Sequence, residues 1–170
     1  MTVPQPPPAR NQPSGDRRTQ HRPVLVSACL LGRECRYDGR HNRDSALERE
    51  LDEQGLRAVP FCPEEHGGLG TPRPAAWIEA RSAEHVLAGE ARVVTDDGRD
   101  VTAEFVRGAE GALETCKTHA IRLALLKERS PSCGVAQTHV AGVAVDGPGV
   151  TAALLARHGI EVRGVPGRRA

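Results

Sequence analysis

Three short apolar runs of the chain each lead into a cysteine. The runs and their cysteines are 24–28 before Cys29, 56–61 before Cys62, and 121–126 upstream of Cys133. Short apolar runs bounded by turn residues are typical of buried strands, most naturally of a parallel sheet with both faces covered. In an open parallel α/β sheet, ligands bind in the crevice outside the carboxyl ends of the strands. The pattern therefore predicts three thiols at one sheet edge.

Apolar residues at helical spacing occur between these runs. Ser45 and Glu48 form a capping box, Leu47 and Leu51 lie four residues apart, and Gly55 ends the segment, so we expect a helix here.

A second helix is expected to start near residue 100 or 102. Its apolar stripe consists of Val101, Phe105, Ala109, Ala112, Leu113 and Cys116. Cys116 lies on this stripe, so we expect a cysteine packed in the core.

The remaining segments predict further short elements. They are a strand and turn over 91–99 that can form an edge hairpin, a single strand within 135–147, a helix over 150–158 ended by Gly159, and a last strand over 160–162. Strand and helix alternate, which predicts a single-domain α/β layered fold, Rossmann-like, with a mainly parallel sheet and the site at the carboxyl edge of its strands.

The expected domain covers residues 23–163. Residues 1–22 carry five prolines and several arginines with almost nothing to bury, which predicts a disordered tail. Residues 164–170 are expected to form a flexible C-terminal tail.

Residues 63–80 show no periodicity, and a structureless loop of that length in a compact domain is usually functional. Prolines flank Arg73 and restrict the backbone there, so its guanidinium is either aimed at a partner or substrate, or simply solvated on a stiff loop.

Charge and composition narrow the function. The net charge is +1 and aromatic residues make up 2% of the chain, which argues against a nucleic-acid partner. No apolar run approaches the roughly 20 residues that span a bilayer, and the N-terminus lacks the apolar core of a signal peptide. We therefore expect a cytoplasmic protein without a membrane partner, either a monomer or a homodimer.

The chain has five cysteines and no C-x-x-C motif, which disfavours a disulfide framework, a zinc ribbon and a thioredoxin-type pair. Dispersed thiolates at strand ends suit soft metals and iron–sulfur clusters. A four-iron cluster held by three cysteines would leave one iron without a protein ligand. The alternatives are cysteines that act as small core residues, zinc held by three cysteines and His66, and a metal-free redox pair of Cys29 and Cys35.

Polar residues accompany these cysteines. Glu64 follows Cys62 and Asp38 lies in the loop after the first strand, where a carboxylate could move protons or remain solvated. Ser130 lies three residues before Cys133, so its hydroxyl is expected to face the same pocket or to cap a turn.

Several motifs match a known family in order and spacing. They are Val26-Ser-Ala-Cys-Leu-Leu-Gly32, Cys35-Arg-Tyr-Asp-Gly39, Cys62-Pro-Glu64, Gly67-Gly-Leu69, Thr71-Pro-Arg-Pro74, Asp100-Val-Thr102, Phe105, Gly108-Ala109, Ala112-Leu113, Leu126-Lys127, Ser130-Pro-Ser-Cys-Gly134 and Gly149-Val-Thr-Ala-Ala-Leu-Leu155. Over about residues 23–163 the chain resembles the DUF523 family, which includes the thiouracil desulfidases.

The resemblance implies a cytoplasmic, oxygen-sensitive enzyme that removes sulfur from thiolated pyrimidine bases such as thiouracil, giving the oxo base and hydrogen sulfide. By motif, a [4Fe-4S] cluster would be held by Cys29, Cys62 and Cys133, with one iron lacking a protein ligand. Glu64 would handle the protons in a hydrolytic C–S cleavage. The substrate would be oriented by three further residues: Ser130, Asp38 and Arg73.

Two departures from the family pattern concern the substrate rather than the cluster. Trp77 follows Pro74-Ala-Ala76, where the family continues Pro-Pro-Ala-Glu, and residues 136–140 lack the usual Asp-Gly and aromatic. The competing functions are a non-catalytic iron–sulfur or zinc protein, and a sulfur-transfer enzyme acting on another thio-compound. An ATP-dependent thiolation enzyme is disfavoured because the chain has no phosphate-binding Gly-rich loop.

Overall fold

The computed structural model describes residues 21–168, so most of the expected N-terminal tail lies outside the described residues. A central sheet contains β2 (Leu56–Phe61), β1 (Arg22–Ser27), β5 (Leu123–Lys127) and β8 (Glu161–Val165), in that spatial order. Every neighbouring pair in it is parallel. The predicted α/β fold with a mainly parallel sheet is therefore confirmed for this sheet, and β8 runs three residues further than the predicted strand.

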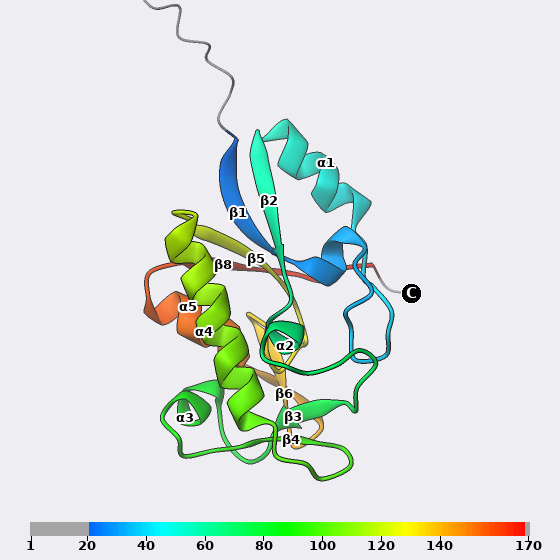
Figure 1. Ribbon diagram of the computed structural model, residues 1–170, viewed down its shortest axis with the longest axis vertical. Helices are drawn as coiled ribbons and strands as arrows, with labels where there is room; N and C mark the ends of the chain where they lie inside the picture. Colours follow the sequence, from blue (N-terminus) through cyan, green and yellow to red (C-terminus); the bar gives the residue numbers. More distant parts are fainter. Residues whose placement is uncertain (1–20, 169–170) are drawn as a thin grey trace, which may run out of the picture.

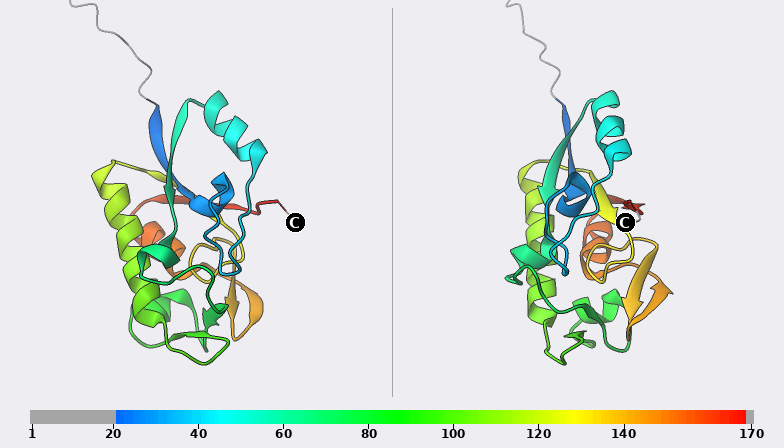
Figure 2. Two further views of the ribbon diagram at one scale, coloured as in Figure 1. Left: turned by 45° about the vertical axis from the view of Figure 1, so that its right-hand side comes forward. Right: turned by 90° about the vertical axis from the view of Figure 1, so that its right-hand side faces the viewer.

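Helices cover both faces of the central sheet, with α1 (Ser45–Glu53) on one side and α4 (Thr102–Thr118) and α5 (Val150–Arg157) on the other (Figures 1 and 2). Successive side chains of β1 point to opposite faces. Leu25 accordingly packs in the apolar cluster with α4 and α5, whereas Val24 and Val26 pack in the cluster with α1. Burial on both faces explains why the two central strands, β1 and β5, are apolar over residues 24–26 and 123–126.

The first helix begins one residue away from the predicted cap. Asp44 is its N-cap, and its carboxylate accepts hydrogen bonds from the backbone N–H groups of Ala46 and Leu47. The predicted capping box of Ser45 and Glu48 is wrong because Glu48 pairs with Arg43 instead.

A second, smaller sheet was not predicted. It contains β4 (Val93–Thr95), β3 (Ala76–Ile78), β6 (Gln137–Val140) and β7 (Val143–Asp146), in that order, and lies below the central sheet in Figure 1. The single strand expected within 135–147 is instead the antiparallel hairpin of β6 and β7. Ala141 and Gly142 form its turn with φ values of +50° and +77°, as a two-residue type I′ turn requires.

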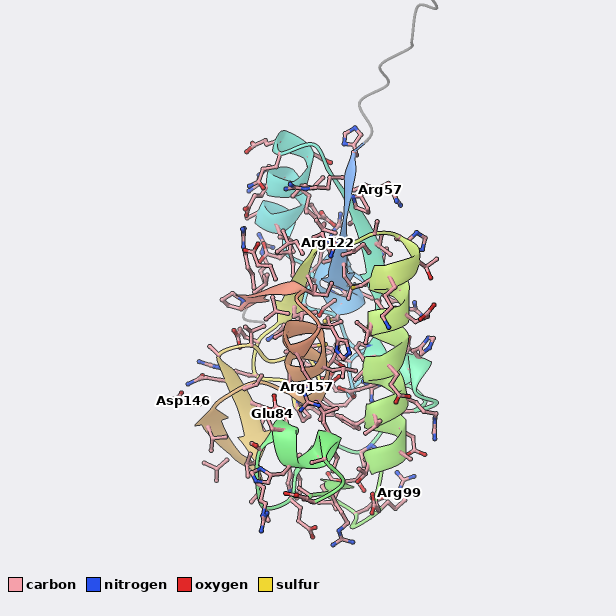
Figure 3. The ribbon with its side chains drawn as sticks, turned by 90° about the vertical axis from the view of Figure 1, so that its left-hand side faces the viewer. Arg57, Glu84, Arg99, Arg122, Asp146 and Arg157 are labelled. Atoms are coloured by element: carbon pink, nitrogen blue, oxygen red, sulfur yellow. The ribbon has the colours of Figure 1, made fainter. Side chains whose placement is uncertain are left out.

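Two short helices also lie in segments that carry no periodic signal. They are α2 (Pro63–His66) and α3 (Ala83–Leu87). The segment expected to be a structureless loop over 63–80 thus contains α2 and β3. On the face shown in Figure 3, Arg157 of α5 and Glu84 of α3 form an ion pair that joins these two helices.

The strand order of the central sheet changes direction at β1, because β2 is added on one side of β1 and β5 on the other. The chain first crosses through α1 to β2, and later returns to place β5 on the other side. In open α/β sheets such a switch point leaves a crevice at the carboxyl ends of the strands. The described residues include no helix both long and apolar enough to cross a membrane.

Candidate functional site

A cavity of about 370 Å³ lies at the carboxyl ends of β1, β2 and β5. Four cysteines line it: Cys29, Cys35, Cys62 and Cys133. Its volume falls within the ~300–1,000 Å³ range of small-molecule sites. The structure therefore brings together the three cysteines predicted from the apolar pattern, and it adds Cys35.

Each of the three predicted cysteines follows its strand closely. Cys29 lies in a single 3₁₀ turn, η1 (Ala28–Leu31), directly after β1, and Cys62 is the N-cap residue of α2 directly after β2. Cys133 lies in the turn after β5 and is 6% exposed. Cys35 comes from the loop after η1, and its carbonyl oxygen is 3.8 Å from the sulfur of Cys62.

The thiols of Cys35, Cys62 and Cys133 are held in their protonated form, because the pKa of each is raised. A hydrogen bond with the Cys29 thiol, followed by burial, raises the pKa of Cys35 to about 12. Burial raises the pKa of Cys133 to about 12, and the hydrogen bond with Cys35 together with burial raises that of Cys62. Because metal ligation requires thiolates, a bound cation must displace these protons, so binding is coupled to pH.

Arg73 is aimed at Glu64 across the cavity wall. Its Nε and Nη2 atoms lie 2.7 and 2.6 Å from the same carboxylate oxygen. The guanidinium is 7% exposed and also donates to the carbonyl oxygens of Cys35 and Gly70 and to the hydroxyl of Thr71. The proline-flanked arginine is thus not a solvated side chain. It fixes the orientation of Glu64 and ties the second cysteine loop to the first.

Asp38 is not among the residues that line the cavity. Its carboxylate accepts hydrogen bonds from Arg36 and Arg40. Burial raises the pKa of Asp38, but these hydrogen bonds outweigh it and hold the pKa below its usual value. Arg36 does line the cavity, so Asp38 reaches the site only through that guanidinium.

Ser130 meets both expectations placed on it. Its hydroxyl oxygen accepts hydrogen bonds from the backbone N–H groups of Ser132, at 3.2 Å, and Cys133, at 3.0 Å, and so caps the turn that carries the third cysteine. The residue also lines the cavity. Its hydroxyl proton is donated to no other described residue.

The described residues place His66 away from the cavity lining. Its ring packs against Phe61, with ring centroids 4.9 Å apart, and lies against Gly111 of α4. A zinc site made of three cysteines and His66 is therefore not supported by the structure.

Lys127 and Glu128 are residues of the candidate site that were not predicted from the sequence. Lys127 lines the cavity at the end of β5, and its pKa is lowered by burial. The Glu128 carboxylate accepts hydrogen bonds from the backbone N–H groups of three consecutive residues, Val135, Ala136 and Gln137. These hydrogen bonds fix the chain beyond Cys133. The signal that could have found them is an adjacent charged pair at the end of a wholly apolar run.

A close backbone contact between α2 and α4 positions Cys62 and Glu64. A Cβ atom at Gly108 would lie 2.1 Å from the carbonyl oxygen of Pro63, and one at Gly67 would lie 2.0 Å from the carbonyl oxygen of Glu104. Only glycine permits this approach, so the two glycines determine how far α2 stands from the long helix.

We expect Gly108→Ala to reduce the free energy of unfolding by about 1–3 kcal/mol, because the added methyl group forces α2 away from α4. Urea denaturation measures this. Gly70→Ala is the matched control, since a Cβ atom there meets nothing within 4 Å, and it should change stability by less than about 0.5 kcal/mol. Equal stability of the two variants would contradict the contact.

Comparison with known proteins agrees with this geometry. The sequence profile of the 2-thiouracil desulfurase family matches residues 24–164. The "uncharacterized protein YbbK" of Bacillus subtilis (strain 168) is 42% identical over 142 residues, which cover 82% of this chain and 93% of that protein. A solved structure described as the "[4Fe-4S]-dependent thiouracil desulfidase TudS" matches with a TM-score of 0.70 and 50% identity, over 83% of this chain and 89% of the other. The resemblance found in the sequence motifs is confirmed, and the chain belongs to the 2-thiouracil desulfurase family.

Proposed function

We propose that this protein is a [4Fe-4S]-dependent desulfidase that converts thiolated pyrimidine bases, such as thiouracil, into the oxo base and hydrogen sulfide. The observation that carries the proposal is the meeting of three thiols, from the ends of three neighbouring parallel strands, at one cavity. Family membership and the similarity to a protein named as a [4Fe-4S]-dependent thiouracil desulfidase support it.

The donor set fits an iron–sulfur cluster. Thiolates are the ligands such clusters require, and four cysteines line the cavity, whereas His66 is not among its lining residues. We assign the ligands to Cys29, Cys62 and Cys133, which leaves one iron without a protein ligand. When bound, the cluster would supply a Lewis-acidic iron that polarises the C–S bond of the substrate.

Glu64 is assigned the proton transfer in a hydrolytic cleavage. Its carboxylate lines the cavity beside Cys62, and Arg73 holds one of its oxygens. The second oxygen is then oriented to take a proton from the attacking water and to return it to the departing sulfur. Arg73 acts on the substrate through Glu64, as a positioning residue.

Ser130 is assigned the orientation of the base. Its oxygen already accepts two backbone N–H groups, so the remaining interaction open to it is donation of its own proton to a base carbonyl or ring nitrogen. Asp38 would contribute by fixing Arg36 at the cavity wall. We place the reaction in the cytoplasm, on a small-molecule substrate, without nucleic-acid or membrane partners.

The test is anaerobic reconstitution with iron and sulfide, followed by measurement of sulfide released from 2-thiouracil and related thio-bases. We expect about four irons per chain and release of one sulfide per base converted. A chain that binds the cluster but releases no sulfide from any thio-base would favour the non-catalytic iron–sulfur protein, and the proposed activity would be rejected.

A further inference from the structure

Cys35 belongs to a compact group of atoms that could bind a metal ion. Of the residues in this group, the proposed cluster uses Cys62 and leaves Cys35 and Glu65 without a role. The sulfur atoms of Cys35 and Cys62 and a carboxylate oxygen of Glu65 all lie within 4.8 Å of one another. The Cys29 thiol lies outside this group but within hydrogen-bond reach of Cys35, so it can supply a fourth donor. Cys133 also lies outside this group, and its buried thiol is within hydrogen-bond reach of Ser27, not of Cys35.

Three sulfurs and one carboxylate oxygen form a donor set for zinc. Zn²⁺ takes cysteine sulfur and carboxylate oxygen as ligands and is almost always four-coordinate in closed sites. The three grouped donors lie close enough to bind one ion, and rotation of the Cys29 side chain beside Cys35 would bring in the fourth. The group and Cys29 together therefore offer a complete coordination shell from two loops and the first turn of α2.

Glu65 is oriented for such a role. One carboxylate oxygen accepts a hydrogen bond of 2.8 Å from the hydroxyl of Thr71, the kind of outer contact that fixes a metal-binding carboxylate. The other has no hydrogen bond of good geometry among the described residues, although the Arg33 guanidinium lies 2.7 Å away. The Arg33 side chain is 60% exposed, so this ion pair is weak and yields readily to a cation.

The surrounding charge also suits a zinc site. Three thiolates and a carboxylate around Zn²⁺ carry a net charge of −2, since binding releases three thiol protons. Three arginines lie beside the group: Arg33 on Glu65, Arg73 on the Cys35 carbonyl oxygen, and Arg36 on the cavity wall. Arg73 and Arg36 are already paired with Glu64 and Asp38, so among these three it is Arg33 whose positive charge offsets part of the negative charge of the occupied site.

We propose that the cluster-free protein binds one Zn²⁺ through Cys29, Cys35, Cys62 and Glu65. Two of these residues are also proposed cluster ligands, so zinc and the iron–sulfur cluster exclude each other. The site uses Cys35 and not Cys133, whereas the cluster uses Cys133 and not Cys35. The two metal centres can therefore be separated by variants of these two cysteines.

The experiment uses the full chain, freed of iron under anaerobic reducing conditions, and titrated with Zn²⁺ against a chromophoric chelator. We expect one zinc per chain in the wild type and in Cys133→Ser. Loss of an outer contact lowers metal affinity by about 10–100-fold, so loss of a ligand in Cys35→Ser should lower it by about 100-fold or more. Co²⁺ provides a second readout, because its thiolate charge-transfer absorption per metal falls with each sulfur ligand lost.

Glu65→Gln is a second variant that keeps the hydrogen bond from Thr71 and leaves every thiol in place. It should lower zinc affinity at least tenfold without reducing the cobalt charge-transfer band. Zinc binding by Cys35→Ser as tight as in the wild type would overturn the proposal. Equal losses in Cys133→Ser and Cys35→Ser would also overturn it, because the cluster cysteines would then hold the zinc.

Preloading with zinc should block formation of the cluster absorption during reconstitution, and a chelator should restore it. This result depends only on shared ligands and not on desulfidase activity, so failure of the proposed enzymatic function leaves it intact. Simultaneous binding of one zinc and four irons by the same chain would contradict mutual exclusion and the proposed ligand set.

Discussion

Cys133→Ala should remove the iron–sulfur cluster and the release of sulfide together. This residue is the proposed ligand in the turn after β5, and a cluster left with two of its three proposed ligands should not be retained. We expect iron content and the visible absorption after anaerobic reconstitution to fall to background, and sulfide release from 2-thiouracil to fall by at least ~1,000-fold. The two losses should match because the activity depends entirely on the bound cluster.

Cys116→Ala is the matched control. Cys116 is a buried cysteine of α4 that packs in the apolar core and does not line the cavity. The substitution should lower the free energy of unfolding by about 1 kcal/mol while iron content stays at the wild-type level. Retention of four irons by Cys133→Ala would show that Cys35 or another group serves as the third ligand.

Glu64→Gln should separate cluster binding from catalysis. The amide fills the same space and still accepts a hydrogen bond from Arg73, but it cannot take a proton from water. We expect normal iron content and an unchanged cluster spectrum, with a fall in kcat of about 100- to 10,000-fold, the usual contribution of a general base. Sulfide release under saturating 2-thiouracil measures the effect.

Glu79→Gln provides the comparison. Glu79 also pairs with an arginine, Arg92 at 2.8 Å, but the pair is exposed and lies outside the cavity lining. This variant should keep its activity within about twofold, since exposed ion pairs stabilise a protein little. If Glu64→Gln kept full turnover, another group would have to carry out the proton transfer. The role of Glu64 would then be structural only.

The central sheet was predictable because its two inner strands, β1 and β5, are apolar on both sides. Residues 24–26 and 123–126 are fully or nearly buried, and an uninterrupted apolar run carries that information in the sequence. The parallel direction of the strands was predictable from the helices between them, since parallel neighbours need crossover connections, but the order of the strands was not predicted. The long helix was equally visible, because Phe105, Ala109 and Cys116 repeat at helical spacing and are buried.

The second sheet escaped prediction because its strands are short and partly polar. β3 and β4 have three residues each, and β7 is mostly exposed. These strands are therefore too short or too exposed to show a clear alternation of apolar and polar residues in the sequence. The hairpin turn uses Ala141 at positive φ, a residue that gives no turn signal of its own. Helix α2 is a single turn started by Pro63, too short for any periodicity.

At the site, motif matching and strand-end placement picked out cysteines that the structure gathers at one cavity, and contacts between loops remained hidden. The spacing of Cys35 from Cys29 does not indicate that its sulfur meets that of Cys62, which comes from a different strand. Nor does the sequence show that Asp38 turns toward Arg36 and Arg40 and away from the cavity. Such choices depend on which partners the folded loops bring within reach.

The placement of the proposed ligands on β1, β2 and β5 has a consequence for biosynthesis. The first two proposed ligands, Cys29 and Cys62, leave the ribosome well before the third. Cys133 lies 71 residues beyond Cys62 in the chain (133 − 62). β5 pairs directly with β1, so the third ligand arrives only when the centre of the sheet closes. With this ligand set, a nascent chain halted before β5 would lack one of the three cysteines, so we expect iron and sulfide to be delivered only after β5 and the turn that follows it have been made.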